Sequence, residues 1–271
     1  MPMKRLNVSG LTLNVFDEGS GDAVLLLHGF PDSHRVWRHQ IPEFLKAGYR
    51  VIAPDLRGFG QSDKPQGKEA YTIPLLIGDV VATLDASKVE SAHVVAHDWG
   101  ATLAWCVAAL LPDRVKSLTA LSVGHPETFY TGSITQREKS WYMLLFQYPN
   151  AEQLLADDDW QLFREWTRNH AETDRWIEVL SAPGALTSAL NWYRANIDPA
   201  VKTSGILKVA ARTMGIWSSG DPYLTEQLML DSRRHVSGPW RYARVEDAGH
   251  WLQLDRPQFV NGLILEFLRG E

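Results

Sequence analysis

Short apolar runs alternate with helix-like stretches along the first half of the chain. Runs such as Ala23–Leu27 are continuously apolar, which is typical of strands buried on both faces of a parallel sheet. Apolar residues at helical spacing, as in Ile73–Leu84 and through Trp37, Ile41 and Leu45, predict helices between them. This alternation predicts a parallel, doubly wound α/β sheet. The strands expected are a hairpin at Lys4–Val8 and Leu11–Phe16, followed by Ala23–Leu27, Tyr49–Ala53, His93–Ala96 and Val115–Val123.

The strand–helix rhythm stops near Pro126 and returns near Arg212. Residues 126–203 contain helical patterns rich in Trp, Leu, Phe and Tyr, with no convincing buried strand. We therefore expect a core formed by residues 1–125 and 204–271, with residues 126–203 inserted as a helical cap. Beyond the insertion we expect strands at Arg212–Ser218 and Arg241–Val245, a helix through Leu228 between them, and a last helix at Pro257–Leu268.

Composition narrows the class of protein. The net charge is −5 and no Lys/Arg-rich block occurs, which argues against a nucleic-acid partner. Cys106 is the only cysteine, so neither an intrachain disulfide nor a cysteine metal cluster can form. The histidines show no metal-ligand spacing, and we expect no metal and no cofactor. With no signal-like start and no apolar run of membrane-spanning length, we expect a soluble cytoplasmic protein whose oligomeric state stays open.

The segment Ala96-His97-Asp98-Trp99-Gly100 carries the most specific chemical signal. Small residues lie two places before and two places after Asp98, at a junction between an expected strand and an expected helix. This is the steric requirement of a nucleophile elbow, in which a strained residue is lifted into a cleft at a sharp turn. The alternative is a structural role, in which Asp98 is the N-cap of the following helix.

A nucleophile on an elbow requires an acid and a histidine, in that chain order, at the ends of later strands. Asp221 and His250 follow the two expected strands and meet this requirement. We expect His250 to act as general base and Asp221 to orient its imidazole. Asp221 could instead be a turn residue before Pro222, Glu127 is a weaker rival for the acid position, and His250 could be structural.

A carboxylate nucleophile indicates displacement at an sp³ carbon. Serine attacking such a carbon would form an ether, which an ordinary triad cannot hydrolyse, whereas Asp98 would form an alkyl ester that activated water can cleave. Ester cleavage needs an oxyanion hole, and the backbone N–H groups of Phe30 and Trp99 are the expected donors. The two realistic leaving groups are an epoxide oxygen and a halide.

With these residues in place, the sequence resembles the α/β-hydrolase superfamily and, within it, the epoxide hydrolases, over nearly the whole chain. His28-Gly29-Phe30-Pro31 resembles the family's HGxP motif, and the resemblance predicts a cis peptide between Phe30 and Pro31. His97-Asp98-Trp99-Gly100 matches the nucleophile motif, and Gly249-His250-Trp251 matches the histidine motif.

The resemblance further implies two cap tyrosines that hydrogen-bond the ring oxygen. Leu190-Asn191-Trp192-Tyr193-Arg194 resembles the segment that carries one of them, and Tyr142 resembles the other by its spacing to Phe146-Gln147. Tyr148 or Tyr130 could take the place of Tyr142, and either tyrosine could simply be packing. We expect the substrate to be a small, mostly apolar epoxide that reacts with water, in a pocket lined by Phe30, Pro31, Trp99, Trp141, Trp192 and Trp251.

The reaction expected from this resemblance is conversion of an epoxide and water to a vicinal diol. Haloalkane dehalogenases are the close alternative, because they share the Asp-Trp pair. They usually need a second halide donor at the position of Phe30, which has none, although Trp141 or Trp192 could substitute. Fluoroacetate dehalogenases place arginines where this chain has Trp99 and Thr102, and a non-catalytic receptor on the same fold is a further hypothesis.

Overall fold

One mixed sheet runs through the centre of the molecule. The computed structural model describes residues 3–8, 10–130, 132–197 and 208–270. Within them, β1 and β2 form an antiparallel hairpin, β2 pairs antiparallel with β4, and all later pairings are parallel. The strand order is β1 (Met3–Val8), β2 (Leu11–Glu18), β4 (Arg50–Pro54), β3 (Ala23–Leu27), β5 (Ala92–His97), β6 (Val115–Leu121), β7 (Arg212–Ser218) and β8 (Trp240–Val245).

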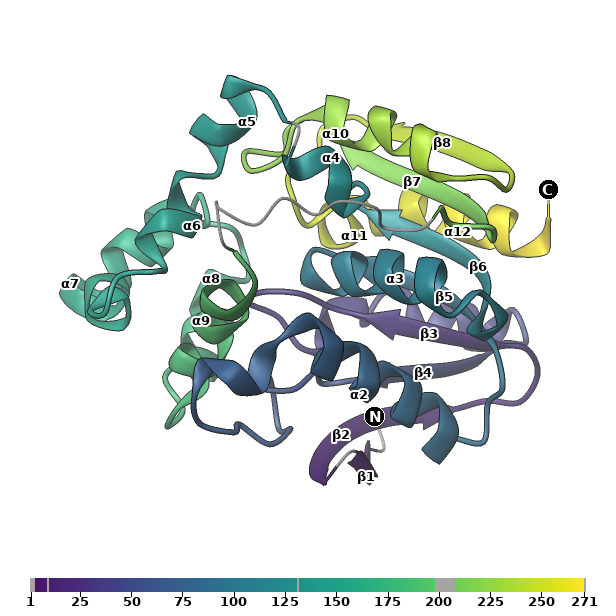
Figure 1. The fold of residues 1–271 in the computed structure, drawn as a ribbon, viewed down its shortest axis with the longest axis horizontal. Helices are drawn as coiled ribbons and strands as arrows, with labels where there is room; N and C mark the ends of the chain where they lie inside the picture. The colour runs from purple at the N-terminus through teal and green to yellow at the C-terminus, as the bar shows by residue number, and fades with distance from the viewer. Residues whose placement is uncertain (1–2, 9, 131, 198–207, 271) are drawn as a thin grey trace.

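Helices cover both faces of this sheet, so its central strands are fully enclosed. All five residues of β3 are buried, as its continuously apolar sequence requires, and all six of β5 are buried, His93 and His97 included. Figure 1 shows α2, α3 and α10 on the viewer's side of the sheet and α12 behind it. The helices of this layer are α1 (Ile41–Lys46), α2 (Ile73–Ala86), α3 (Trp99–Leu110), α10 (Glu226–Asp231), α11 (Leu252–Asp255) and α12 (Pro257–Arg269), with 3-10 turns η1 (His34–Trp37), η2 (Lys68–Tyr71), η3 (Pro112–Arg114) and η4 (Ser232–His235).

A helical insertion connects β6 to β7. Figure 1 shows α6 to α9 grouped together beyond one end of the sheet. The end of the expected cap, residue 203, lies outside the described residues, so the division of the chain into core and cap stays a prediction. The helices of the insertion are α4 (Pro126–Tyr130), α5 (Ile134–Lys139), α6 (Trp141–Leu145), α7 (Ala151–Trp166), α8 (Thr173–Leu180) and α9 (Ala185–Asn196).

The predicted fold class is confirmed, and each expected strand is present to within three residues at either end. One helix prediction was wrong. The pattern through Trp37, Ile41 and Leu45 forms two short elements, η1 and α1, in place of one helix. Pro42 lies in the first turn of α1, where its missing N–H group is tolerated, and a continuous helix through it would lose a hydrogen bond. Among the described helices, none is long and apolar enough to cross a membrane.

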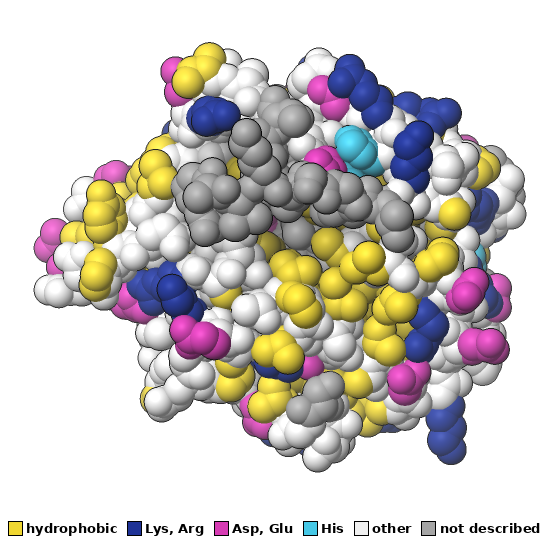
Figure 2. Space-filling view, viewed as in Figure 1, with side chains coloured by type: hydrophobic (Ala, Val, Ile, Leu, Met, Phe, Trp, Pro, Cys, Tyr) yellow, Lys and Arg dark blue, Asp and Glu magenta, His cyan; other side chains and the backbone are white. Residues whose placement is uncertain are grey.

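The outer surface of the insertion carries exposed apolar side chains. Trp141 is 48% exposed and Leu144, one turn further along α6, is also exposed. Figure 2 shows hydrophobic side chains at the surface over the α6–α7 end of the molecule. The opposite side of α6 is buried through Tyr142. The helix therefore turns one aromatic residue outward and its neighbour inward.

Candidate active site

The turn between β5 and α3 has the geometry of a nucleophile elbow. Asp98 has φ 54° and ψ −125°, a conformation that a side-chain-bearing residue adopts only when its surroundings impose it. A Cβ atom added to Gly100 would overlap the backbone carbonyls of Leu27 and His28, and one added to Gly29 would overlap the Asp98 carboxylate. The glycines in the two motifs are therefore required by close approach of β3 to the turn.

The structure brings Asp98, His250 and Asp221 together from three strand ends. His250 Nδ1 lies 2.9 Å from Asp221 Oδ2, and its Nε2 lies 3.5 Å from Asp98 Oδ2. All three side chains are largely or fully enclosed. Burial acts to lower the pKa of His250, but the carboxylates on both sides of the ring raise it to about 10. Burial acts to raise the pKa of Asp98, and the interaction with His250 brings it below its ordinary value.

Two further side chains hold the histidine loop. The carbonyl of His250 accepts hydrogen bonds from Ser122 Oγ, at 2.9 Å, and from His97 Nε2, at 3.0 Å. Burial lowers the pKa of His97 to about 3, so its ring is neutral and acts as a hydrogen-bond donor to the loop. Ser122 was missed. Its φ of 66° just beyond β6 places its hydroxyl against the loop, and its position after a strand was the one available signal.

Backbone N–H groups contact the carboxylate of Asp98. Phe30 N donates to Asp98 Oδ1 at 2.7 Å, and a hydrogen bond from the Trp99 backbone also lowers the pKa of this carboxyl. The peptide between Phe30 and Pro31 is cis, as predicted. Oδ1 therefore occupies the position of an oxyanion, while Oδ2 faces His250. An arrangement of this kind can stabilise negative charge on Oδ1 and leave Oδ2 free to attack.

Tyr142 and Tyr193 lie side by side above Asp98. Their ring centroids are 6.2 Å apart, and the ring of Tyr193 packs edge-on against Trp99 at 5.1 Å. Both are buried, which raises the pKa of each hydroxyl well above its ordinary value, and the negative charge of Asp98 raises it further. Both hydroxyls are therefore neutral near pH 7 and can donate hydrogen bonds.

A cavity of about 430 Å³ begins at these residues. Asp98, Trp99, Tyr142 and Tyr193 all line it. The rest of its wall follows α3 away from the elbow and is mainly apolar, with Val123, Phe129, Met143 and Leu224 among the lining residues. A volume of this size accommodates a small organic molecule.

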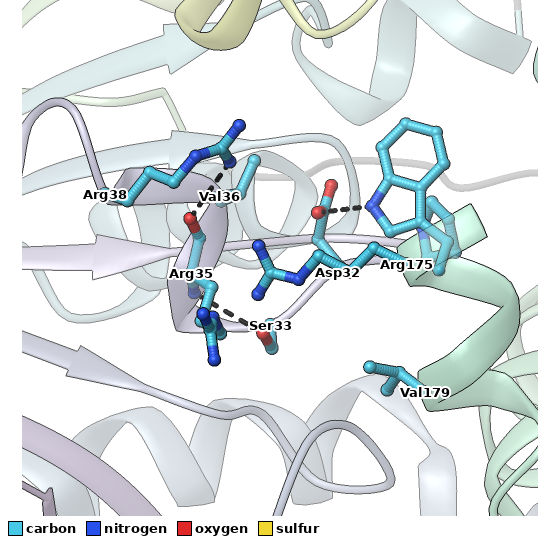
Figure 3. A pocket seen from close by; sticks show the side chains of 9 residues that line it. Asp32, Ser33, Arg35, Val36, Arg38, Arg175 and Val179 are labelled. Atoms are coloured by element: carbon cyan, nitrogen blue, oxygen red, sulfur yellow. Dashed lines mark hydrogen bonds between the residues drawn. The ribbon is translucent and has the colours of Figure 1, made fainter. Parts of the chain in front are cut away.

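Five of the six expected pocket side chains do not line this cavity. Trp141 points to solvent, because adjacent residues on a helix diverge by about 100° and Tyr142 faces inward. Trp192 is fully buried and donates its indole N–H to the Arg57 carbonyl at 3.0 Å. Trp251 packs behind His250 against Trp176, with ring centroids 4.3 Å apart in the latter pair. Pro31 lines a separate small pocket between η1 and α8 (Figure 3).

Phe30 is buried without lining the cavity through its ring, although its backbone N–H reaches Asp98. Its ring packs against Phe146, Trp166 and Tyr193, all from the helical insertion. Trp99 is thus the only one of the six whose side chain lines the cavity, among the residues that the structure describes.

The alternatives for the tyrosine and acid positions can be located. Tyr148 is 57% exposed and is not among the residues that line the cavity of Asp98. The side chain of Tyr130 lies outside the described residues. Glu127 is in α4, and the acid that bonds His250 is Asp221.

Comparison with known proteins places this geometry in a family. Residues 22–257 match the family model described as alpha/beta hydrolase fold. The chain therefore belongs to the α/β-hydrolase family. It is 34% identical to Epoxide hydrolase A of Mycobacterium tuberculosis, over 99% of this chain and 98% of that protein. It is equally similar to the AB hydrolase superfamily protein YfhM of Bacillus subtilis, over 98% and 97% of the two chains.

Solved structures agree with this assignment. An epoxide hydrolase from metagenomes of hot environments superposes with a TM-score of 0.89 at 30% identity, covering 100% of this chain and 99% of the other. The chain is thus an epoxide-hydrolase-like member of the α/β-hydrolase family.

Proposed function

We propose that this protein is an epoxide hydrolase, which opens an epoxide with water to give a vicinal diol. One observation carries the proposal: two neutral, buried tyrosines face the same cavity as the carboxylate of Asp98. A nucleophile alone would suit several leaving groups. A pair of hydroxyl donors opposite it suits a leaving oxygen that stays attached to the substrate and gains negative charge.

In the first step, Asp98 Oδ2 attacks a ring carbon and the ring C–O bond breaks. Tyr142 and Tyr193 donate hydrogen bonds to the ring oxygen, and one of them gives up its proton to the alkoxide. Asp98 Oδ1 remains on the Phe30 N–H, at 2.7 Å, and becomes the carbonyl oxygen of the new ester. Because this hydrogen bond holds Oδ1, the carboxylate has a fixed orientation, and the attacking oxygen Oδ2 has a fixed direction.

In the second step, neutral His250 takes a proton from water, whose oxygen attacks the carbonyl carbon of the ester. The acyl C–O bond then breaks, the diol leaves with the proton from His250, and the carboxylate of Asp98 is restored. Before attack, His250 lies between two carboxylates and is protonated, because its pKa is raised to about 10. Ester formation removes the charge of Asp98, and the remaining support for the imidazolium comes from Asp221. The pKa of His250 then falls, and its proton passes through water to the tyrosinate left by ring opening, so the histidine is neutral and can act as the base of the second step.

The structure disfavours the dehalogenase alternative. Such an enzyme would need a second halide donor beside Trp99, and Trp141 and Trp192 were the candidates. Trp141 faces solvent, and the indole N–H of Trp192 is already bound to the Arg57 carbonyl. No specific observation favours a non-catalytic receptor.

A single turnover in ¹⁸O-labelled water tests the covalent mechanism. Water attacks the acyl carbon in our scheme, so the first diol should carry no label and the Asp98 carboxylate should gain it. Peptide mass spectrometry reads the carboxylate, and gas chromatography with mass detection reads the diol. Label found in the first diol would exclude an ester on Asp98.

Parallel assays with styrene oxide and 1-bromobutane test the leaving group. We expect diol from the epoxide and little halide from the bromide. Tyr142→Phe and Tyr193→Phe should each lose epoxide opening, and Tyr148→Phe serves as the matched control because Tyr148 is exposed. Halide release without diol formation would favour the dehalogenase instead.

A further inference from the structure

Gln136, on α5 of the helical insertion, has its whole amide engaged. Its Nε2 donates to the Tyr223 carbonyl at 2.8 Å and to Ser140 Oγ at 2.9 Å. Its Oε1 accepts from Thr225 N at 2.8 Å and from Thr225 Oγ1 at 3.1 Å. The side chain is 1% exposed. Because a carbonyl must accept and a backbone N–H must donate, only this orientation of the amide satisfies its neighbours.

These bonds end on the loop that holds Asp221. Tyr223 N and Leu224 N donate to Asp221 Oδ1 at 2.8 and 3.0 Å, while Asp221 Oδ2 is bonded to His250. The Tyr223 carbonyl and the Leu224 N–H belong to one peptide unit. Gln136 therefore binds one end of the peptide whose other end binds the carboxylate. A continuous series of hydrogen bonds leads from α5 to the imidazole.

We propose that Gln136 is a positioning residue for ester hydrolysis, because it fixes the Tyr223–Leu224 peptide that aligns the Asp221 carboxylate with His250. The inference rests on the proposed function, since it assigns these residues to its second step. Lys139, one turn further along α5, supports the same loop by donating to the Asp221 carbonyl at 2.9 Å. The bond series leads to His250, which takes a proton only in the hydrolysis step, whereas the bonds of the alkylation step are made and broken by Asp98 and the two tyrosines.

The neighbouring contacts limit what else Gln136 could do. Its amide has no capacity left for substrate, and it is absent from the residues that line the cavity. Tyr223 itself stands between Tyr142 and His250, with ring centroids 5.5 and 5.1 Å from theirs. A shift of the Tyr223 backbone would therefore also disturb the face of the histidine. When a residue that positions a catalytic group is lost, the reaction rate falls by about 10- to 100-fold.

Rapid-quench single turnovers with styrene oxide separate the two steps. In Gln136→Met we expect ester hydrolysis to slow by about 10- to 100-fold while alkylation stays within about threefold. The ester of the enzyme should then accumulate, which intact-protein mass spectrometry detects. Gln136→Glu keeps the shape and the bonds to Thr225, and at a pH at which its buried carboxyl is ionised it opposes the Tyr223 carbonyl with a negative charge, so we expect the same defect there. Gln147→Met is the matched control, because Gln147 is exposed on the same insertion and bonds only within it.

Two results would overturn the inference: equal slowing of both steps, or wild-type hydrolysis in Gln136→Glu. If Gln136→Met does not fold, Gln136→Glu carries the test, since it preserves the packing. Proton NMR gives a readout that needs no substrate. The downfield resonance of the His250 Nδ1–H should shift or broaden in Gln136→Glu and stay in place in Gln147→Met. If the wild type opens no epoxide, the proposed function fails, while this resonance still decides whether Gln136 aligns Asp221.

Discussion

Asp32, two residues after Phe30, should make the stability of the protein fall as the pH rises toward neutrality. Its carboxyl is buried, and Oδ1 accepts the indole N–H of Trp176 on α8 at 2.8 Å (Figure 3). Oδ2 has no hydrogen bond of normal geometry, although the Trp251 indole lies close enough to affect the group. Burial raises the pKa of Asp32 from 3.8 to about 7, against opposing contributions from Trp176 and His170.

The direction of this pH dependence follows from whether Asp32 ionises first in the folded or in the unfolded state. Between pH 4 and 7 the unfolded chain loses the proton of Asp32 while the folded protein keeps it, so unfolding becomes more favourable with each pH step. About three pH units separate the two pKa values, and each corresponds to about 1.4 kcal/mol. The folded state should therefore lose up to about 4 kcal/mol from this group, with no further loss above pH 7.

Asp32→Asn removes this dependence and keeps an oxygen for Trp176. The buried NH₂ group has no partner at the Oδ2 position, which costs about 1–3 kcal/mol at every pH. Between pH 4 and 8, the free energy of unfolding of the variant should nonetheless rise by up to about 4 kcal/mol relative to that of the wild type. Urea unfolding at several pH values measures this difference.

Asp17→Asn is the control, because Asp17 is also buried and is bonded to Arg50 and Lys4, which keep their charges between pH 5 and 8. Burial acts to raise its pKa, but the hydrogen bonds from these two side chains bring it below its ordinary value. Its contribution is complete above about pH 4 and is lost only as the pH falls further, so the Asp17→Asn difference should be flat from pH 5 to 8. A flat Asp32→Asn difference over the same range would refute the reasoning.

Three further predictions concern the active site. Gly29→Ala should slow alkylation by about 100-fold or more in stopped-flow assays, because the new methyl group would displace the Asp98 carboxylate, whereas Gly262→Ala, which has open space, should not. Tyr193→Phe should slow ester formation by about 100- to 1000-fold, measured in single turnovers, and leave hydrolysis of any ester formed unchanged. Asp98→Asn imitates the loss of charge on alkylation, so NMR titration should find the pKa of His250 below its wild-type value, and an unchanged value would contradict the proposed activation of the base.

The residues at the strand ends could be predicted from the sequence because the signals for them lie within a few neighbouring residues. β3 is continuously apolar, and β5 is apolar between His93 and His97. In a parallel sheet, the polar residue that follows such a strand lies at the common carboxyl edge of the strands. The positions of Asp98, Asp221 and His250 followed from that rule. The small residues around Asp98 also had one steric explanation, which the positions of Gly29 and Gly100 support.

The side chains of the insertion were harder to assign, because helical periodicity gives a face without saying what it packs against. Trp141 and Tyr142 are neighbours on α6, and only one of them can point into the cavity. Trp192 and Tyr193 show the opposite case: both are buried on α9, one against the Arg57 carbonyl and the other against Trp99. The difference lies in which surfaces meet each helix, and that depends on contacts between residues far apart in the sequence.

The insertion also supports the loops that carry the site. Trp176 bonds Asp32 in the loop after β3, and Gln136 bonds the loop after β7. His170 Nε2 lies 3.0 Å from Asp255 Oδ1, whose other oxygen accepts the Gly249 N–H next to His250. Two loops of the sheet edge thus receive a polar contact directly from the insertion, and the loop before α11 receives one through Asp255. Truncating the insertion would therefore remove supports for the oxyanion donor, the acid and the base together, in addition to the two tyrosines.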